Sequence, residues 1–146
     1  MFHEQRLTVP ETPAELRAEY QDDFERALED AGASDTDASD AAAATDLERE
    51  RLDAVLAGDE PELSLEEAAQ IQALADGAPD AETLVTIACE HLLLGMTTAV
   101  LDVDALESEL AIEMDAKEIQ QKIEQRAPMS FDEYVHIQHA IVANTP

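Results

Sequence analysis

One short stretch of the chain carries side chains suited to contacting nucleic acid. Residues 115–126 are predicted to form a helix, and five of its side chains are candidate DNA contacts: Lys117, Gln120, Gln121, Lys122 and Arg126. Basic side chains contact phosphates, and glutamine amides contact base edges in the major groove. The stretch is therefore a candidate DNA-reading helix.

The charge around this stretch supports a second interpretation. Residues 117–146 hold three basic and four acidic side chains, a net charge of −1, so the other 116 residues carry −26. A patch of reduced charge is also typical of a protein interface, because interface cores are depleted in charged residues. We favour a protein partner or a homodimer contact here and keep DNA binding as the alternative.

A cluster near the C-terminal end has the residue types of a metal site. A carboxylate and an imidazole could share a metal ion at the helical spacings of Asp132, Glu133, His136 and His139. Asp132 and Glu133, however, are needed at the start of a predicted helix, so we expect no metal site. The cluster is better explained as ordinary surface and semi-buried side chains.

Other signals of catalysis are absent from the sequence. The only cysteine, Cys89, lies within an apolar run, which favours a core position over a nucleophile. With four glycines in all, the chain has no glycine-rich loop that could hold a phosphate. We expect no enzyme activity, no cofactor and no small-molecule substrate.

Composition indicates a folded chain with an unusually acidic surface. The 146 residues include 35 acidic and 8 basic side chains, a net charge of −27, yet 45% of the residues are hydrophobic. This combination resembles proteins of salt-accumulating halophilic archaea, in which concentrated salt screens the repulsion between carboxylates. It predicts folding that depends on salt.

The sequence also predicts a cytoplasmic protein that does not span a membrane. Residues 1–10 lack the basic region and apolar run of a signal peptide. The long apolar run at residues 83–101 has Glu90 and His91 near its centre, which argues against a membrane span.

Helical periodicity and start signals predict an all-α fold of about eight helices. Thr12, Ser64 and Ser130 are each followed three residues later by a glutamate, the pattern of a capping box. Residues 33–44 could be a linker or could include a short alanine-rich helix. Because residues 83–101 are apolar on nearly every side, we expect other helices to cover most of that helix.

An internal repeat suggests how the helices are organised. Leu63-Ser64-Leu65-Glu66-Glu67 matches Met129-Ser130-Phe131-Asp132-Glu133 at an offset of 66. The chain is interpreted as two degenerate four-helix units, residues 12–76 and 80–143, that share one core packed on a central helix at about 81–101. Residues 1–11 would form a tail that docks through Phe2, Leu7 or Val9.

The first unit resembles a known DNA-binding fold. It carries apolar residues six and three positions before a glycine, followed by a proline and a capped helix: Leu52, Val55, Gly58, Pro61 and Ser64. Over about 35 residues this resembles the helix-turn-helix domain of the lambda-repressor (Cro/C1) class. The second unit has Gln125 in place of the terminal glycine.

This resemblance implies a helix-turn-helix-like fold, and the residues decide which unit could read DNA. The corresponding helix of the first unit offers mostly acidic side chains around Arg49 and Arg51, so the second unit's helix, 115–126, is the better candidate. The whole chain also resembles an uncharacterised family of small acidic haloarchaeal proteins. The sequence thus favours a non-enzymatic interaction or regulatory adaptor module, with a DNA-binding transcription regulator as the alternative.

Overall fold

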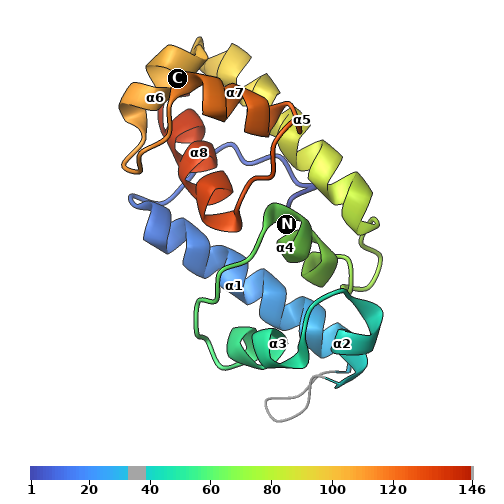
Figure 1. The fold of residues 1–146 in the computed structure, drawn as a ribbon. Coiled ribbons are helices and arrows are strands. Elements are labelled where there is room, and N and C mark those ends of the chain that lie inside the picture. Colours follow the sequence, from blue (N-terminus) through green and yellow to red (C-terminus); the bar gives the residue numbers. More distant parts are fainter. Residues whose placement is uncertain (33–38, 146) are drawn as a thin grey trace.

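The protein is all α-helical, as its sequence predicts. A computed structural model describes residues 1–32 and 39–145. Within these ranges lie eight helices and no β-strand (Figure 1): α1 (Pro13–Asp30), α2 (Ser39–Ala44), α3 (Arg49–Leu56), α4 (Leu65–Gln72), α5 (Ala81–Ala99), α6 (Val103–Glu109), α7 (Ala116–Ile123) and α8 (Phe131–Ala143). The alanine-rich stretch therefore contains a short helix, α2, while residues 33–38 lie outside the described part of the chain.

The three predicted capping boxes form at the starts of α1, α4 and α8. In each box a hydroxyl accepts a hydrogen bond from the backbone N–H three residues on, and the glutamate there accepts one from the cap residue's N–H, in the pairs Thr12–Glu15, Ser64–Glu67 and Ser130–Glu133. A hydroxyl cap stabilises a helix by about 1 kcal/mol. Local sequence therefore fixes where these helices begin.

Four helices end in a residue with left-handed backbone conformation. After α1 and α3 this residue is glycine, Gly32 and Gly58, with φ of 82° at both. After α5 and α7 it is Val100 and Gln125, with φ of 56° and 62°. The left-handed conformation costs a residue with a Cβ roughly 1–2 kcal/mol. Helices α5 and α7 of the second half thus end in the same left-handed conformation as α1 and α3 of the first half, but without the glycine that favours it.

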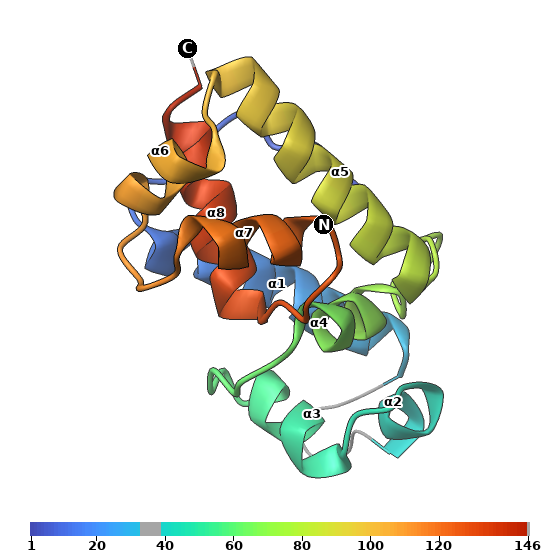
Figure 2. The ribbon, with the colours of Figure 1, turned by 45° about the horizontal axis from the view of Figure 1, so that its top comes forward.

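The segments matched by the repeat lie side by side in antiparallel orientation. Leu65 N–H donates to the Met129 carbonyl at 2.9 Å, and Phe131 N–H donates to the Leu63 carbonyl at 2.8 Å. This single bridge is centred on Ser64 and Ser130 and joins the starts of α4 and α8 (Figure 2). Two equivalent segments related by a twofold axis would meet in this way, although the division into units 12–76 and 80–143 stays a prediction.

Helix α5 lies along one side of the molecule rather than at its centre. It packs against α4, α8 and α7 and buries one face through Leu84, Ala88 and Leu92. Leu93 and Leu94 on the outer side are 46% and 50% exposed, so the expectation that helices cover most of α5 is wrong. The reason is that α4, α7 and α8 lie against the same face, and none of the other described helices covers the outer one.

Helix α8 is more deeply enclosed than α5. Seven of its thirteen residues are buried, against five of nineteen in α5, and it packs against α1, α4, α5 and α6.

Among the described residues no single helix is long and apolar enough to cross a membrane. Helices α5 and α6 together reach that length and composition, but their axes meet at 93°.

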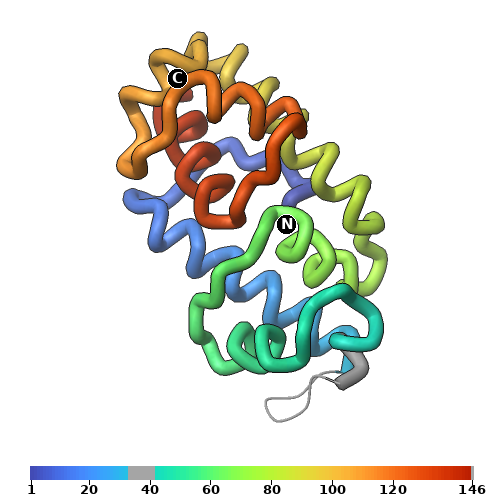
Figure 3. The backbone as a smooth tube through the Cα atoms, viewed as in Figure 1, coloured from blue at the N-terminus to red at the C-terminus, as the bar shows by residue number. Residues whose placement is uncertain are grey.

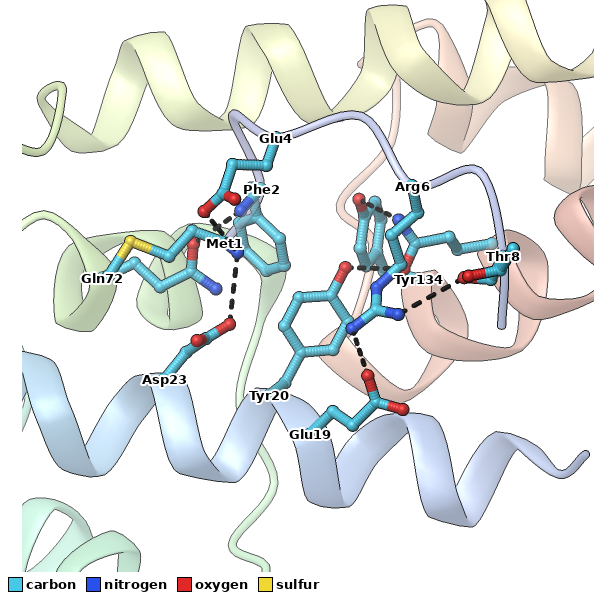
Figure 4. A network of polar contacts seen from close by, with 11 residues as sticks. Met1, Phe2, Glu4, Arg6, Thr8, Glu19, Tyr20, Asp23, Gln72 and Tyr134 are labelled. Atoms are coloured by element: carbon cyan, nitrogen blue, oxygen red, sulfur yellow. Dashed lines mark hydrogen bonds and ion pairs between the residues drawn. The ribbon is translucent and has the colours of Figure 1, made fainter. Parts of the chain in front are cut away.

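The N-terminal segment is part of the core. In Figure 3 it crosses behind α8 and ends beside α4. Phe2 is 1% exposed, and its ring lies 4.8–6.2 Å from the rings of Tyr20, Phe131 and Tyr134. Its backbone N–H donates to the buried Gln72 side chain at 2.9 Å (Figure 4). Of the predicted anchors, Phe2 docks fully, Val9 is partly buried and Leu7 stays exposed.

Candidate interaction surfaces

The predicted DNA-reading helix is shorter than expected. Helix α7 ends at Ile123, and Gln125 turns the backbone into the left-handed region, so Arg126 lies beyond the helix. Arg126 forms an ion pair with Glu124 and Gln120 contacts the same carboxylate, whereas Gln121 is half-buried. Lys117 is exposed near the start of the helix. The five candidate residues do not form one continuous basic surface.

Lys122 is held inside the protein by two glutamates. Its side chain is 13% exposed, its Nζ lies 3.1 Å from Glu118, and it also forms an ion pair with Glu133. Burial disfavours its charged form, but the hydrogen bonds and charges of Glu133 and Glu118 outweigh that effect and raise the pKa of Lys122. A phosphate contact through this side chain would have to displace both carboxylates.

The first half of the molecule contains a similar ion pair between two consecutive helices. Arg51 of α3 forms an ion pair with Glu67, the capping-box glutamate of α4, just as Lys122 of α7 binds Glu133, the capping-box glutamate of α8. Burial raises the pKa of Glu67, but the hydrogen bonds from Arg51 and Ser64 outweigh it and lower the pKa overall. One base on each supposed recognition helix, Arg51 on α3 and Lys122 on α7, therefore links that helix to the one that follows.

The side chains considered above as a possible metal site each have other structural partners. Asp132 binds Arg17 at 2.6 Å, Glu133 is held in its capping box, and His139 Nε2 lies 2.8 Å from the Pro10 carbonyl oxygen. Burial lowers the pKa of His136. Within residues 1–32 and 39–145, no group of three or more His, Cys, Asp or Glu side chains is placed to hold a metal ion.

Neither the cysteine nor the small cavity beside α5 offers a reactive centre. Cys89 is buried on α5, and burial raises the pKa of its thiol to about 11, which keeps it protonated. Between α5, α8 and the N-terminal segment lies a cavity of about 50 Å³, lined in part by His91, Gly95 and Gln138. Its volume holds one or two water molecules rather than a metabolite.

The outer face of α5 is an apolar surface that periodicity alone does not reveal. Leu93 and Leu94 are exposed on this face, and Val100 follows directly after the last residue of the helix. Val100 is 88% exposed. Residues 83–101 contain one acidic side chain, Glu90, and no lysine or arginine. The sequence of residues 83–101 predicts a fully buried helix because its buried and exposed positions carry the same apolar residue types.

The comparison with family models places the chain in a family. Residues 16–144 match the model of a family of unknown function, DUF5791. The chain belongs to this family. The match spans every helix except the first residues of α1 and includes both capping-box pairs at α4 and α8. No curated protein and no solved structure matches the chain.

Proposed function

We propose that the protein is a non-enzymatic protein-interaction or regulatory adaptor module that binds through the outer face of α5. The carrying observation is the exposure of Leu93, Leu94 and Val100 on one helix of a chain with a net charge of −27. Contiguous exposed apolar side chains rimmed by polar residues are a mark of protein interaction sites.

Charge supports the choice of this face over the more acidic parts of the surface. Bringing a partner close to carboxylates removes water from them, which is costly unless each finds a partner. The outer face of α5 instead offers hydroxyls, from Thr86 and Thr97. It carries two carboxylates, Glu82 in the first turn of the helix and Glu90 near its middle. It is therefore a surface that a partner can cover at a low cost in desolvation.

The remaining proposals concern the scaffold and its setting. We propose that the two halves have a helix-turn-helix-like arrangement kept as a scaffold, in which Arg51 and Lys122 brace helices rather than contact phosphates. The acidic surface suits a cytoplasm of high salt concentration, since salt screens repulsion between its carboxylates.

Site-specific photocrosslinking in cells tests the proposed surface. With a benzophenone amino acid in place of Leu94 we expect a discrete protein adduct, because that side chain is half exposed on the outer face of α5. The matched control replaces Glu50, an exposed residue of α3, a helix for which no packing against α5 is found. Equal adducts from both positions, or none from position 94, would contradict the proposal.

The alternative, a transcription regulator that reads DNA through residues 115–126, rests on Lys117 and Gln120. Both are exposed on α7 and could reach a nucleic acid without breaking an ion pair of Lys122. If the alternative holds, Lys117→Glu should abolish DNA recovery after crosslinking in cells, whereas Arg49→Glu should not. Recovery that responds equally to both substitutions would exclude α7 as the reading helix.

A further inference from the structure

Val100 combines two features that a stability argument does not explain. It is a β-branched residue in the left-handed conformation, a genuine outlier for that residue type, and it is 88% exposed. It ends α5 with its N–H on the Thr97 carbonyl, while Leu101 N–H reaches the Met96 carbonyl. This is the helix-end motif that glycine usually completes. A strained, exposed apolar residue indicates a role outside the isolated chain.

The exposed side chains form a stripe with few charges. Leu93 and Thr86 lie along one line of α5, Thr97 lies beside it, and Val100 follows directly after the helix. Glu90 is the charged residue beside the middle of the stripe, and Glu82 lies at its start. Elsewhere the chain carries almost its whole net charge of −27. The stripe is therefore a surface on which a second acidic molecule could approach without a row of opposing carboxylates.

We propose that the outer face of α5 binds a second copy of this chain, with the two α5 helices packed antiparallel. This deepens the proposed function by naming the partner. With the twofold axis between Leu93 and Leu94, each Leu93 lies against the second copy's Leu94. Each Glu90 then lies opposite the second copy's Thr97, so that the two Glu90 carboxylates do not face each other.

The charge pattern favours a second copy over a basic partner. A basic partner would gain most from a surface dense in carboxylates, and the middle of the stripe carries only one, Glu90. In the antiparallel pair, the two Glu90 residues are seven positions apart along the axis, which is roughly 10 Å of helix rise. At about 1 M salt the Debye length is about 3 Å, so their mutual repulsion is screened.

The dimer should be weak and dependent on salt. A single helix face with three exposed large apolar side chains is at the small end of specific interfaces, which is typical of transient association. In low salt, repulsion between two chains of −27 opposes the contact. We therefore expect dissociation constants in the micromolar range at multimolar KCl and a monomer in dilute buffer.

Sedimentation velocity of the purified chain over a wide concentration range in about 2 M KCl tests this. We expect the mass to rise from the chain mass of 15.9 kDa toward twice that value. Leu93→Asp should weaken association at least tenfold, because it places a carboxylate against the second copy's Leu94. The matched control Ala18→Asp adds the same charge to an exposed position of α1 and should weaken association by less than threefold.

Val100→Gly separates binding from folding. Glycine suits the left-handed helix end, so the variant should melt a few degrees higher than the parent chain. It also removes an apolar contact of the stripe and should weaken dimerisation severalfold. A more stable chain that dimerises less would support the proposal, whereas unchanged dimerisation would overturn it.

The outcomes also separate this inference from the proposed function. A strict monomer at every protein and salt concentration would overturn the dimer, as would equal weakening by Leu93→Asp and Ala18→Asp. If position 94 then still crosslinks to a different protein in cells, the proposed function stands without a second copy. A monomer with no adduct at position 94 would remove both.

Discussion

Replacing Phe2 by alanine is expected to lower the free energy of unfolding by about 3–5 kcal/mol, the usual cost of deleting a buried phenylalanine ring. The ring is 1% exposed and contacts the rings of Tyr20, Phe131 and Tyr134, which come from α1 and α8. Its removal leaves a cavity where two distant helices meet. Total stabilities are about 5–15 kcal/mol, so a large share would be lost. Urea unfolding at fixed high salt measures this.

Leu7 provides the matched control within the same segment. Its side chain is 77% exposed, so Leu7→Ala should change the unfolding free energy by less than about 0.5 kcal/mol. If Phe2→Ala were as mild as Leu7→Ala, the segment would not be part of the core. A large effect of both would instead point to the backbone of the segment rather than to the Phe2 ring.

Salt is expected to change stability as strongly as a core substitution. At least six of the eight basic side chains already have acidic partners, namely Arg6, Arg17, Arg49, Arg51, Lys122 and Arg126. With 8 basic side chains against 35 acidic ones, most carboxylates cannot have a basic partner. Because the Debye length falls from about 10 Å at 0.1 M to about 3 Å at 1 M salt, added KCl should relieve their repulsion. We expect the melting temperature to rise by roughly 10 °C or more.

Circular dichroism over a series of KCl concentrations measures the effect, and choline chloride at equal ionic strength is the control for screening. If repulsion is the cause, both salts should stabilise the fold to a similar extent. The same melting temperature in dilute and concentrated KCl would show that the acidic surface does not strain the fold.

Local signals were sufficient to predict the helices. The capping residues Thr12, Ser64 and Ser130 mark helix starts through hydrogen bonds that span three residues, and such short-range chemistry is visible in a sequence. The end of a helix is harder to predict when the residue after it does not favour the left-handed conformation that ends the helix. Gln125 stops α7 with the backbone conformation of a glycine, and so the predicted helix 115–126 was too long.

The candidate site depended on contacts that a sequence does not contain. Lys122 matches the residue type of a phosphate contact, but its ion pair with Glu133 on the next helix removes it from the surface. Leu93 and Leu94 have the residue types of a core, and only the arrangement of α4, α7 and α8 leaves them exposed. In both cases tertiary packing, rather than residue type, decides the role of the side chain.

The burial of Phe2 by α8 has a consequence for how the chain is made. Phe2 is synthesised long before Phe131 and Tyr134, the residues of α8 that cover it. Contacts this distant in sequence form slowly, because a long loop must close first. The aromatic centre is therefore completed only once α8 has been synthesised, and a chain that lacks α8 cannot complete this part of the core.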